Sequence, residues 1–442
     1  MTSGARVLVV GGGGKGHALA AALAASPSVA RVVIAPGTSA LEALGFETAP
    51  VASQDLAGLV EHAELEEYDL TVVGPNTPLV DGIVDRFRAA GLPICGPSQQ
   101  AARLEGSKVW ARLLMARMGV PTPRFGVVDG AERALHLART LPWARVFKAD
   151  GPAYDKGVRV THRADEAEAA LEAILVDNVY GLESKRVVVE ERLDGDEATI
   201  VYFTDGAALA VLGHVLNYPR LLDGGGGPPT RGMGQVAPCP LLDAATLEVV
   251  RTRAVEPVLA ALQRMGTPMC GALSVDLMMV RGEPYVIDYN VRFGDPVTQT
   301  LLAGTSGDLY RVLDACRRPG EGDGLAAAMA ALTRDPRPRV ALEVVCEGYP
   351  TRMVRGDGIR LSAALDRALH EPGPDLRVYL DGVRSVPGQG LMTTGGRALT
   401  LVAAGDTVAE ARAAAYDAVA GVSFRGMHWR RDIALAAGGL PQ

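Results

Sequence analysis

Short apolar runs separated by alanine-rich or polar stretches organise the first hundred residues. Each run is followed within a few residues by glycine or proline, and His17–Ala25 has the composition of a helix. Four runs are predicted as buried strands: Arg6–Val10, Arg31–Ile34, Asp69–Val73 and Pro93–Cys95. Strands that alternate with helices are typical of parallel βαβ units. We therefore expect an N-terminal βαβ domain over residues 1–105.

The middle of the chain begins with a helix predicted at Ser107–Met118, which glycine and proline at 119–121 bring to an end. Residues 123–193 predict a compact α+β subdomain, in which the strands Val146–Ala149 and Arg186–Glu190 flank the helix Glu166–Leu175. Short turns predict two hairpins: Ala198–Phe203 with Ala207–Leu212, and Ser274–Val280 with Tyr285–Asn290.

Glycine and proline dominate Asn217–Met233, which is predicted as a loop, and charge with proline predicts a linker at Arg334–Arg339. Beyond the linker, short strands alternate with Asp-Gly and Gly-Gly turns and one helix, Val408–Val419. We expect a central domain over 106–335 and a small α+β C-terminal domain over 336–442, in a chain of the α/β class.

Composition narrows the choice of partners. The 442 residues carry a net charge of -7 and only 5% aromatics, which argues against nucleic acid as a partner. No apolar run has membrane-spanning length, and the N-terminal stretch lacks a secretory apolar region. The five cysteines are scattered, so we predict reduced thiols in a cytoplasmic protein.

Lysine is rare in this chain. Of 44 basic residues only five are lysines: Lys15, Lys108, Lys148, Lys156 and Lys185. Lysine offers a compact point charge on a flexible stem, whereas arginine offers a planar fork. All but Lys185 lie in glycine-bearing or GSK-type segments, which predicts a site that grips a polyphosphate at several points. Chance and base composition are the alternative.

Gly11–Gly16 satisfies G-x-G-x-x-G after a strand and before a helix, a pattern associated with NAD. The second strand, however, ends in Ala35-Pro36, where an acid should bind the ribose. A narrower interpretation survives, in which backbone N–H groups and Lys15 hold a substrate phosphate or carboxylate at a helix N-terminus. A close strand–helix turn without a ligand is the alternative.

Asp288 and Asn290 are two residues apart on a predicted strand, so they point to one face. With a three-residue turn at 281–283, Asp276 falls opposite Asp288. Two acids and an amide on one sheet face suit Mg²⁺, with Mn²⁺ as an alternative ion. Arg292 follows on the same alternation, and metal with arginine would suit phosphoryl transfer. An ordinary polar sheet face is the competing interpretation.

At this point the chain resembles the ATP-grasp enzymes, and within them the phosphoribosylamine–glycine ligase family. The resemblance extends over nearly the whole chain, through segments such as VLVVGGGGKGHALA, RLEGSKVWARLLMARMGVPTP, FKADGPAYDKGV, VIDYNVRFGDPVTQ and TTGGRALTLVAAGDTVAEA. It implies an N-terminal pre-ATP-grasp domain, an ATP-grasp domain with a mobile lid subdomain at about 123–193, and a small C-terminal domain.

The resemblance also implies roles for residues. ATP would be bound by Lys108, Lys148, Gly151, Lys156, Gly157, Glu190, Glu191, Leu193 and Glu197. The metal would be bound by Asp288 and Asn290, with Asp276 added from the hairpin register; Arg292 and Lys156 would be catalytic. The substrates would be held by Gly13, Gly14, Lys15, His17, Asn76, Arg220, Asp223, Arg231, Gly232, Arg292 and Asp295.

The family joins a carboxylate to an amine through an acyl phosphate and releases ADP and phosphate. This chain departs from the family mainly where substrates should bind. The family usually has asparagine, arginine and glutamate where this chain has Gly12, Lys15 and Gly16, and the lid loop carries unusual residues at Pro152, Tyr154 and Asp155. Our hypothesis is a ligase of specialised metabolism with altered small-molecule substrates, acting as a monomer or homodimer.

Four alternatives stay open. The closest is a true phosphoribosylamine–glycine ligase of purine biosynthesis. Another is a non-catalytic ATP-binding protein, which the unusual lid residues would favour. An NAD-dependent oxidoreductase explains only the glycine loop. A biotin-dependent carboxylase shares the ATP-grasp architecture but matches the N-terminal and C-terminal segments less well.

Overall fold

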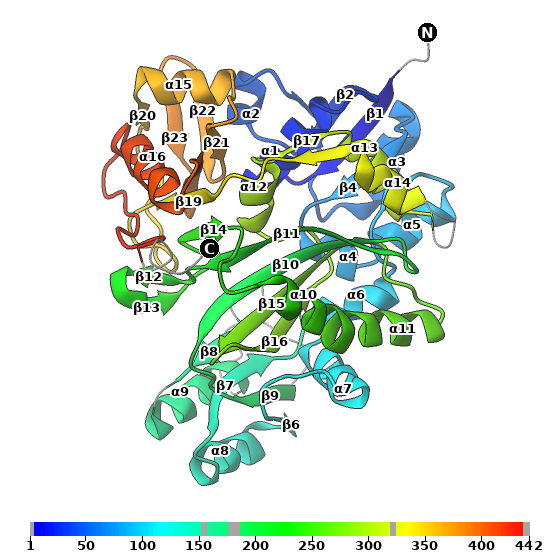
Figure 1. Cartoon of the computed structure of the whole chain (residues 1–442), viewed down its shortest axis with the longest axis vertical. Coiled ribbons are helices and arrows are strands. Elements are labelled where there is room, and N and C mark those ends of the chain that lie inside the picture. Colours follow the sequence, from blue (N-terminus) through cyan, green and yellow to red (C-terminus); the bar gives the residue numbers. More distant parts are fainter. Residues whose placement is uncertain (1–3, 152–156, 162, 176–185, 319–323, 436–442) are drawn as a thin grey trace.

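The computed structural model describes residues 4–151, 157–161, 163–175, 186–318 and 324–435. Figure 1 shows the N-terminal region and the C-terminal region side by side above a central sheet, with a smaller subdomain below it. The course of the chain therefore brings three separate regions to the central sheet.

The N-terminal region is a parallel sheet in the order β3-β2-β1-β4-β5, as the βαβ pattern predicts. Its strands are β1 (Ala5–Val10), β2 (Val29–Ala35), β3 (Glu47–Thr48), β4 (Leu70–Val73) and β5 (Ile94–Cys95). Its helices are α1 (Gly14–Ala24), α2 (Ser39–Ala43), α3 (Leu56–Glu66), α4 (Asn76–Val80), α5 (Ile83–Ala89) and α6 (Gln99–Gly106). Helix α1 begins three residues earlier than predicted, because the second half of the glycine run forms its first turn.

Helix α7 (Lys108–Met118) leads to the lid subdomain; it ends where predicted and begins one residue later, because Ser107 is its N-cap. The Ser107 side chain accepts a hydrogen bond from the backbone of Trp110, and Gly119 adopts φ +68° at the C-cap. The lid sheet has the order β6-β9-β7-β8. Its elements are β6 (Phe125–Asp129), α8 (Ala131–Thr140), β7 (Ala144–Ala149), β8 (Val158–Val160), α9 (Ala164–Leu175) and β9 (Arg186–Glu191).

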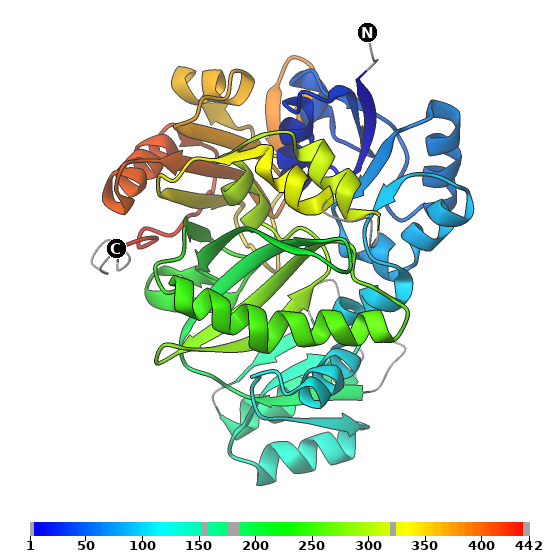
Figure 2. The ribbon, with the colours of Figure 1, turned by 45° about the vertical axis from the view of Figure 1, so that its right-hand side comes forward.

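The central sheet has eight strands in the order β16-β15-β10-β11-β14-β19-β24-β21. They are β10 (Asp196–Thr204), β11 (Leu209–Asn217), β14 (Gly234–Ala237), β15 (Gly271–Val280), β16 (Glu283–Asn290), β19 (Arg339–Val345), β21 (Leu376–Leu380) and β24 (Arg397–Ala404). Helices α10 (Ala244–Val250) and α11 (Glu256–Arg264), joined by a π-helical turn, lie across one face (Figure 2). The C-terminal strands thus extend the sheet that carries the Asp288 hairpin.

Short elements complete the chain. Three helices, α12 (Val297–Leu302), α13 (Leu309–Cys316) and α14 (Gly324–Ala330), follow β16; α15 (Ala363–His370) and α16 (Val408–Ala420) belong to the C-terminal region. The small two-stranded sheets pair β12 (Arg220–Leu222) with β13 (Gly226–Pro229), β17 (Thr305–Gly307) with β18 (Leu332–Arg334), β20 (Arg360–Leu361) with β25 (Val422–Ser423), and β22 (Val383–Val386) with β23 (Gly390–Thr393). The stretch predicted as a loop, Asn217–Met233, therefore contains the β12–β13 hairpin.

Candidate active site

The hairpin of β15 and β16 brings Asp276 and Asp288 together, although by another route than the predicted turn. The turn has two residues, Arg281 and Gly282, both with positive φ, and Val280 pairs with Glu283. That register alone would misalign the two acids by one residue. A bulge at Ile287 restores it, because Leu277 pairs with Val286 and Asp276 with Asp288.

The carboxylate of Asp288 is held by two lysines from different parts of the fold. Lys108 Nζ, from the first residue of α7, lies 2.8 Å from Asp288 Oδ1, and Lys148 Nζ, from β7 of the lid, lies 3.1 Å from Oδ2. Burial alone would raise the pKa of Asp288, but the charges of Lys108 and Lys148 bring it well below its usual range. Asp288 is therefore ionised and joins the lid, α7 and the central sheet.

Arg112 is a fully buried arginine that the sequence did not single out. It is ion-paired with Glu190 of the lid, and its Nη1 and Nη2 donate to the carbonyls of Val286 and Ile287, at 3.2 and 2.6 Å. Lys148 Nζ also donates to the Ile287 carbonyl, at 2.8 Å. The bulge before Asp288 is thus fixed by hydrogen bonds to two cationic side chains.

Asp276, Asn290 and Glu197 lie on the neighbouring strands of the same sheet. Asn290 Nδ2 donates to Asp276 Oδ2 at 2.7 Å, and Thr199 Oγ1 donates to Oδ1 at 2.6 Å. Burial and the charge of Asp276 raise the pKa of Glu197 to about 7. Burial also raises the pKa of Asp276, with the Asp288 charge adding to it. A cation here would lower the repulsion among three carboxyl groups.

The donor set fits Mg²⁺ chemically, since two carboxylates and an amide offer only hard oxygen ligands. In the described part of the chain, no group of three or more His, Cys, Asp or Glu side chains is arranged to hold a metal by itself. A magnesium ion at Asp276, Asp288 and Asn290 would therefore complete its coordination with phosphate oxygens and water, as this ion usually does.

The Arg292 side chain is oriented by Glu105, a residue to which the sequence analysis gave no role. Arg292 Nε donates to Glu105 Oε1 at 3.1 Å, and the backbone N–H of Val291 donates to Oε2 at 2.9 Å. Arg292 Nη2 also reaches Asn290 Oδ1 at 3.2 Å. The sequence contained a signal for Glu105, because this residue belongs to the LEGSK segment that ends in Lys108.

A second cluster lies where the glycine loop meets the C-terminal strands. Arg397 is ion-paired with Asp295, lies 3.2 Å from Asp381 Oδ2 and lies 3.8 Å from Glu343 Oε2. Burial, with the Asp295 charge adding, raises the pKa of Glu343 to about 8, so this side chain is mostly protonated near neutrality. Glu343 Oε1 accepts from Thr400 Oγ1 at 2.9 Å.

The glycine loop itself approaches Asp381. A Cβ on Gly13 would lie 2.7 Å from Asp381 Oδ1, and one on Gly14 would lie 2.9 Å from Gln299 Nε2, so neither position has room for a side chain. Lys15 Nζ donates to the Phe293 carbonyl at 3.0 Å. Burial and the Arg292 charge lower the pKa of Lys15 to about 7. A carboxylate thus faces the loop that was predicted to hold an anion.

The remaining predicted substrate residues lie in different places. His17 Nδ1 accepts from the backbone of Leu380 at 3.0 Å, so this ring joins α1 to β21, and burial lowers its pKa to about 4. Asn76 begins α4. Arg220 and Asp223 are on the β12–β13 hairpin, against the segment 430–432. Gly232 and Arg231 flank the second cluster; the Arg231 carbonyl accepts from Arg397 at 3.4 Å.

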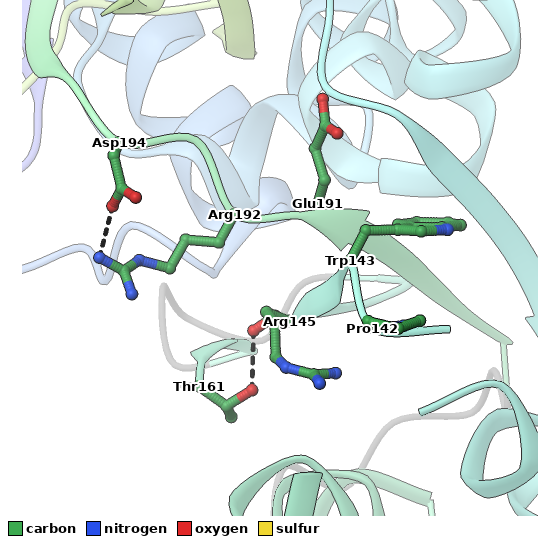
Figure 3. Close-up of a pocket in the computed structure, with 7 residues that line it drawn as sticks. All are labelled: Pro142, Trp143, Arg145, Thr161, Glu191, Arg192 and Asp194. Atoms are coloured by element: carbon green, nitrogen blue, oxygen red, sulfur yellow. Dashed lines mark hydrogen bonds and ion pairs between the residues drawn. The ribbon is translucent and has the colours of Figure 1, made fainter. Parts of the chain in front are cut away.

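Some of the lid residues that the family resemblance implicates in ATP binding lie in the described part of the chain, and others lie outside it. Gly151 follows β7 with φ +114°, and the Gly157 carbonyl accepts from Ala149 at 2.9 Å. Lys156, Pro152, Tyr154 and Asp155 lie outside the described residues. Glu191 is the last residue of β9, and Leu193 follows shortly after it. Both lie beside or next to residues of a hollow of about 230 Å³, drawn in Figure 3 and lined by Pro142, Trp143, Arg145, Thr161, Glu191, Arg192 and Asp194.

The lid sheet and the central sheet meet where Lys108 and Lys148 contact Asp288 of β16. This arrangement defines the class of the protein, which is an ATP-grasp ligase. The matching family models agree. They are the phosphoribosylglycinamide synthetase N domain at residues 5–105, the ATP-grasp (A) domain at 106–298 and the C domain at 339–436. The chain belongs to the phosphoribosylglycinamide synthetase family.

Relatives that match over nearly their full length are named phosphoribosylamine–glycine ligase. Phosphoribosylamine–glycine ligase of Xylella fastidiosa is 38% identical over 430 residues, covering 97% of this chain and 95% of the relative. The enzyme of that name from Neisseria meningitidis is also 38% identical, over 97% and 98%. The crystal structure of the Thermotoga maritima phosphoribosylamine–glycine ligase matches with a TM-score of 0.77 and 28% identity, over 97% of this chain and 100% of that chain.

Biotin carboxylase of Campylobacter jejuni matches the fold with a TM-score of 0.70 at 16% identity, over 96% and 92% of the two chains. This likeness concerns architecture alone. Among the described residues, none of the helices has the length and apolar character needed to cross a bilayer.

Proposed function

We propose that this chain is a phosphoribosylamine–glycine ligase. The observation that carries the proposal is the 38% identity to ligases of that name over 97% of the chain. The cluster of Lys108, Lys148 and Asp288 supports it, since such a cluster suits a nucleotide phosphate chain. The relatives thus favour the alternative in which the substrates are the usual ones over our first hypothesis of altered substrates.

In the proposed reaction the glycine carboxylate attacks the γ-phosphorus of ATP, ADP leaves, and an acyl phosphate forms. The amine of phosphoribosylamine then attacks the acyl carbon, loses a proton and displaces phosphate. Lys108 and Lys148 would hold the phosphates, and Arg292, oriented by Glu105, would offset charge on the transferred group. Asp288, Asn290 and Asp276 would hold Mg²⁺, with Mn²⁺ as a substitute; the ion would neutralise phosphate charge.

The test supplies purified protein with ATP, Mg²⁺, glycine and phosphoribosylamine. We expect glycinamide ribonucleotide, ADP and phosphate in equal amounts, at roughly 1 per second or faster. Production of AMP and pyrophosphate would contradict acyl-phosphate chemistry. ATP cleavage that needs another amine would contradict the substrate assignment while leaving the ligase class intact.

One observation favours a second candidate, a ligase whose amine carries no phosphate. The Asp381 carboxylate lies against Gly13 at the start of α1, where a phosphate group would otherwise meet backbone N–H groups. A negative side chain in that position repels a phosphorylated amine. A panel of amines with and without a phosphate decides between the two candidates by kcat/KM.

A further inference from the structure

The two lysines proposed to bind ATP are already paired with a carboxylate. Lys108 and Lys148 approach Asp288 at 2.8 and 3.1 Å, and the three side chains are at most 23% exposed. Lys148 Nζ also lies 3.3 Å from Glu190 Oε2, but that carboxylate is already ion-paired with the guanidinium of Arg112. Asp288 is thus the group that neutralises the phosphate-binding lysines.

A nucleotide phosphate and Asp288 need the same two cations. If metal-free ATP took both lysines, Asp288 would be left as a partly buried carboxylate beside a polyanion, an expensive arrangement. A divalent cation on Asp288 removes that cost, because it replaces the lysines as the countercharge. Conversely, a metal ion alone would have to bind next to two ammonium groups.

We propose that Asp288 acts as an internal competitor for Lys108 and Lys148, and that this competition makes nucleotide and metal bind only together. The inference rests on the proposed ATP site and deepens it. If the proposal holds, a variant without the Asp288 charge should bind the nucleotide more tightly than the parent in the absence of metal.

Asn290 provides a matched control. It is a proposed metal ligand two residues further along, and its side chain is hydrogen-bonded to Asp276 and Arg292. Asp288→Asn and Asn290→Ala therefore both weaken the metal site, but only Asp288→Asn releases the two lysines. The pair separates loss of a metal ligand from loss of the competitor.

The experiment is isothermal titration calorimetry with ATP, once in EDTA and once in Mg²⁺. In EDTA we expect Asp288→Asn to bind ATP at least about tenfold more tightly than the parent, and Asn290→Ala to stay within about twofold. In Mg²⁺ both variants should bind more weakly than the parent. Equal or weaker metal-free binding by Asp288→Asn overturns the inference. Parent protein that fails to bind ATP even with Mg²⁺ overturns the proposed function instead.

A second measurement needs no variant. Because the chain has only five lysines, selective ¹³Cε labelling gives a spectrum with few signals. Metal-free ATP should leave the signals of Lys108 and Lys148 in place at concentrations where ATP with Mg²⁺ shifts both. If both forms of the nucleotide shift these signals at the same concentration, Asp288 is not a competitor.

Discussion

The Asp288 cluster (Asp288, Lys108 and Lys148) and the Arg397 cluster (Arg397, Asp295, Asp381 and Glu343) both combine acidic and basic side chains, but in opposite proportions. In the first, two lysines surround one carboxylate; in the second, three carboxyl groups surround one arginine. The first has an excess of positive charge and suits a polyphosphate. The second presents Asp381 to the glycine loop. The first cluster is our proposed nucleotide site, and the second lies beside the glycine loop of our proposed acceptor site.

The largest expected effect concerns the Asp288 cluster. Asp288→Ala should lower the rate of ATP cleavage by roughly 10²–10³-fold, because both the proposed metal ligand and the partner of two lysines are lost. Phosphate release measures it. Glu283→Gln, at the exposed turn of the same hairpin, is the matched control and should leave the rate unchanged. A parent-like rate for Asp288→Ala would mean that this cluster is not the reaction centre.

Arg112→Met tests whether the first cluster depends on its buried support. The variant removes the guanidinium that is ion-paired with Glu190 and that donates to the carbonyls of Val286 and Ile287, and it leaves only Lys148 near Glu190. We therefore expect a loss of about 3–5 kcal/mol in the free energy of unfolding. Urea denaturation measures it. Arg117→Met, exposed on the same helix, should change stability by less than about 0.5 kcal/mol. Equal stability of the two variants would contradict the assigned role of Arg112.

Asp381→Asn tests the acceptor side. Removing this charge should lower KM for a phosphorylated amine by about tenfold and leave KM for ATP unchanged. If the natural amine carries no phosphate, its KM should instead rise. Asp375→Asn is the control, since that side chain is 73% exposed. Unchanged KM for every amine would separate Asp381 from substrate selection.

The smallest effect concerns His17, which joins the glycine-loop helix to β21. Its folded pKa of about 4 lies below the usual 6.5, so the unfolded chain binds more protons between these values and stability falls as pH drops from 6.5 toward 4. At pH 5.5, protonation of His17 in the unfolded chain lowers the free energy of unfolding by about 1 kcal/mol. Comparing His17→Gln with the parent by thermal denaturation at pH 7.5 and 5.5 measures it. An identical pH dependence would show that His17 is not the group responsible, and the exposed His370→Gln serves as a control.

The sequence predicts the parallel N-terminal sheet, helix α7 and the Asp288 hairpin because each depends on local signals. The sequence analysis predicted correctly that Asp276 lies opposite Asp288, although the three-residue turn on which it relied was wrong. Positive φ at Arg281 is uncommon for a non-glycine residue, and the bulge at Ile287 compensates for the shorter turn. A bulge held by Arg112 and Lys148 depends on tertiary contacts, which no local pattern displays.

The Arg397 cluster could not be predicted for a related reason. Its members come from four separate segments, and a lone Asp or Glu on a strand resembles a solvent-facing residue until the strand is buried. Two members had a signal: Asp295, which the family resemblance placed among the substrate residues, and Arg397, which belongs to the TTGGR segment. Asp381 had none, although its carboxylate lies against the glycine loop.

The pairing of β14 with β19 links the two regions mechanically. The backbone of β14, Gly234–Ala237, pairs with Arg339–Leu342 of β19, so the chain from Arg339 onward continues the sheet that carries Asp288. A fragment ending before Arg339 would leave β14 as an open sheet edge with unpaired backbone groups, prone to self-association. We therefore expect the segment that carries Asp288 and the chain from Arg339 onward to unfold together, and proteolytic removal of the latter to yield aggregate instead of a smaller ligase.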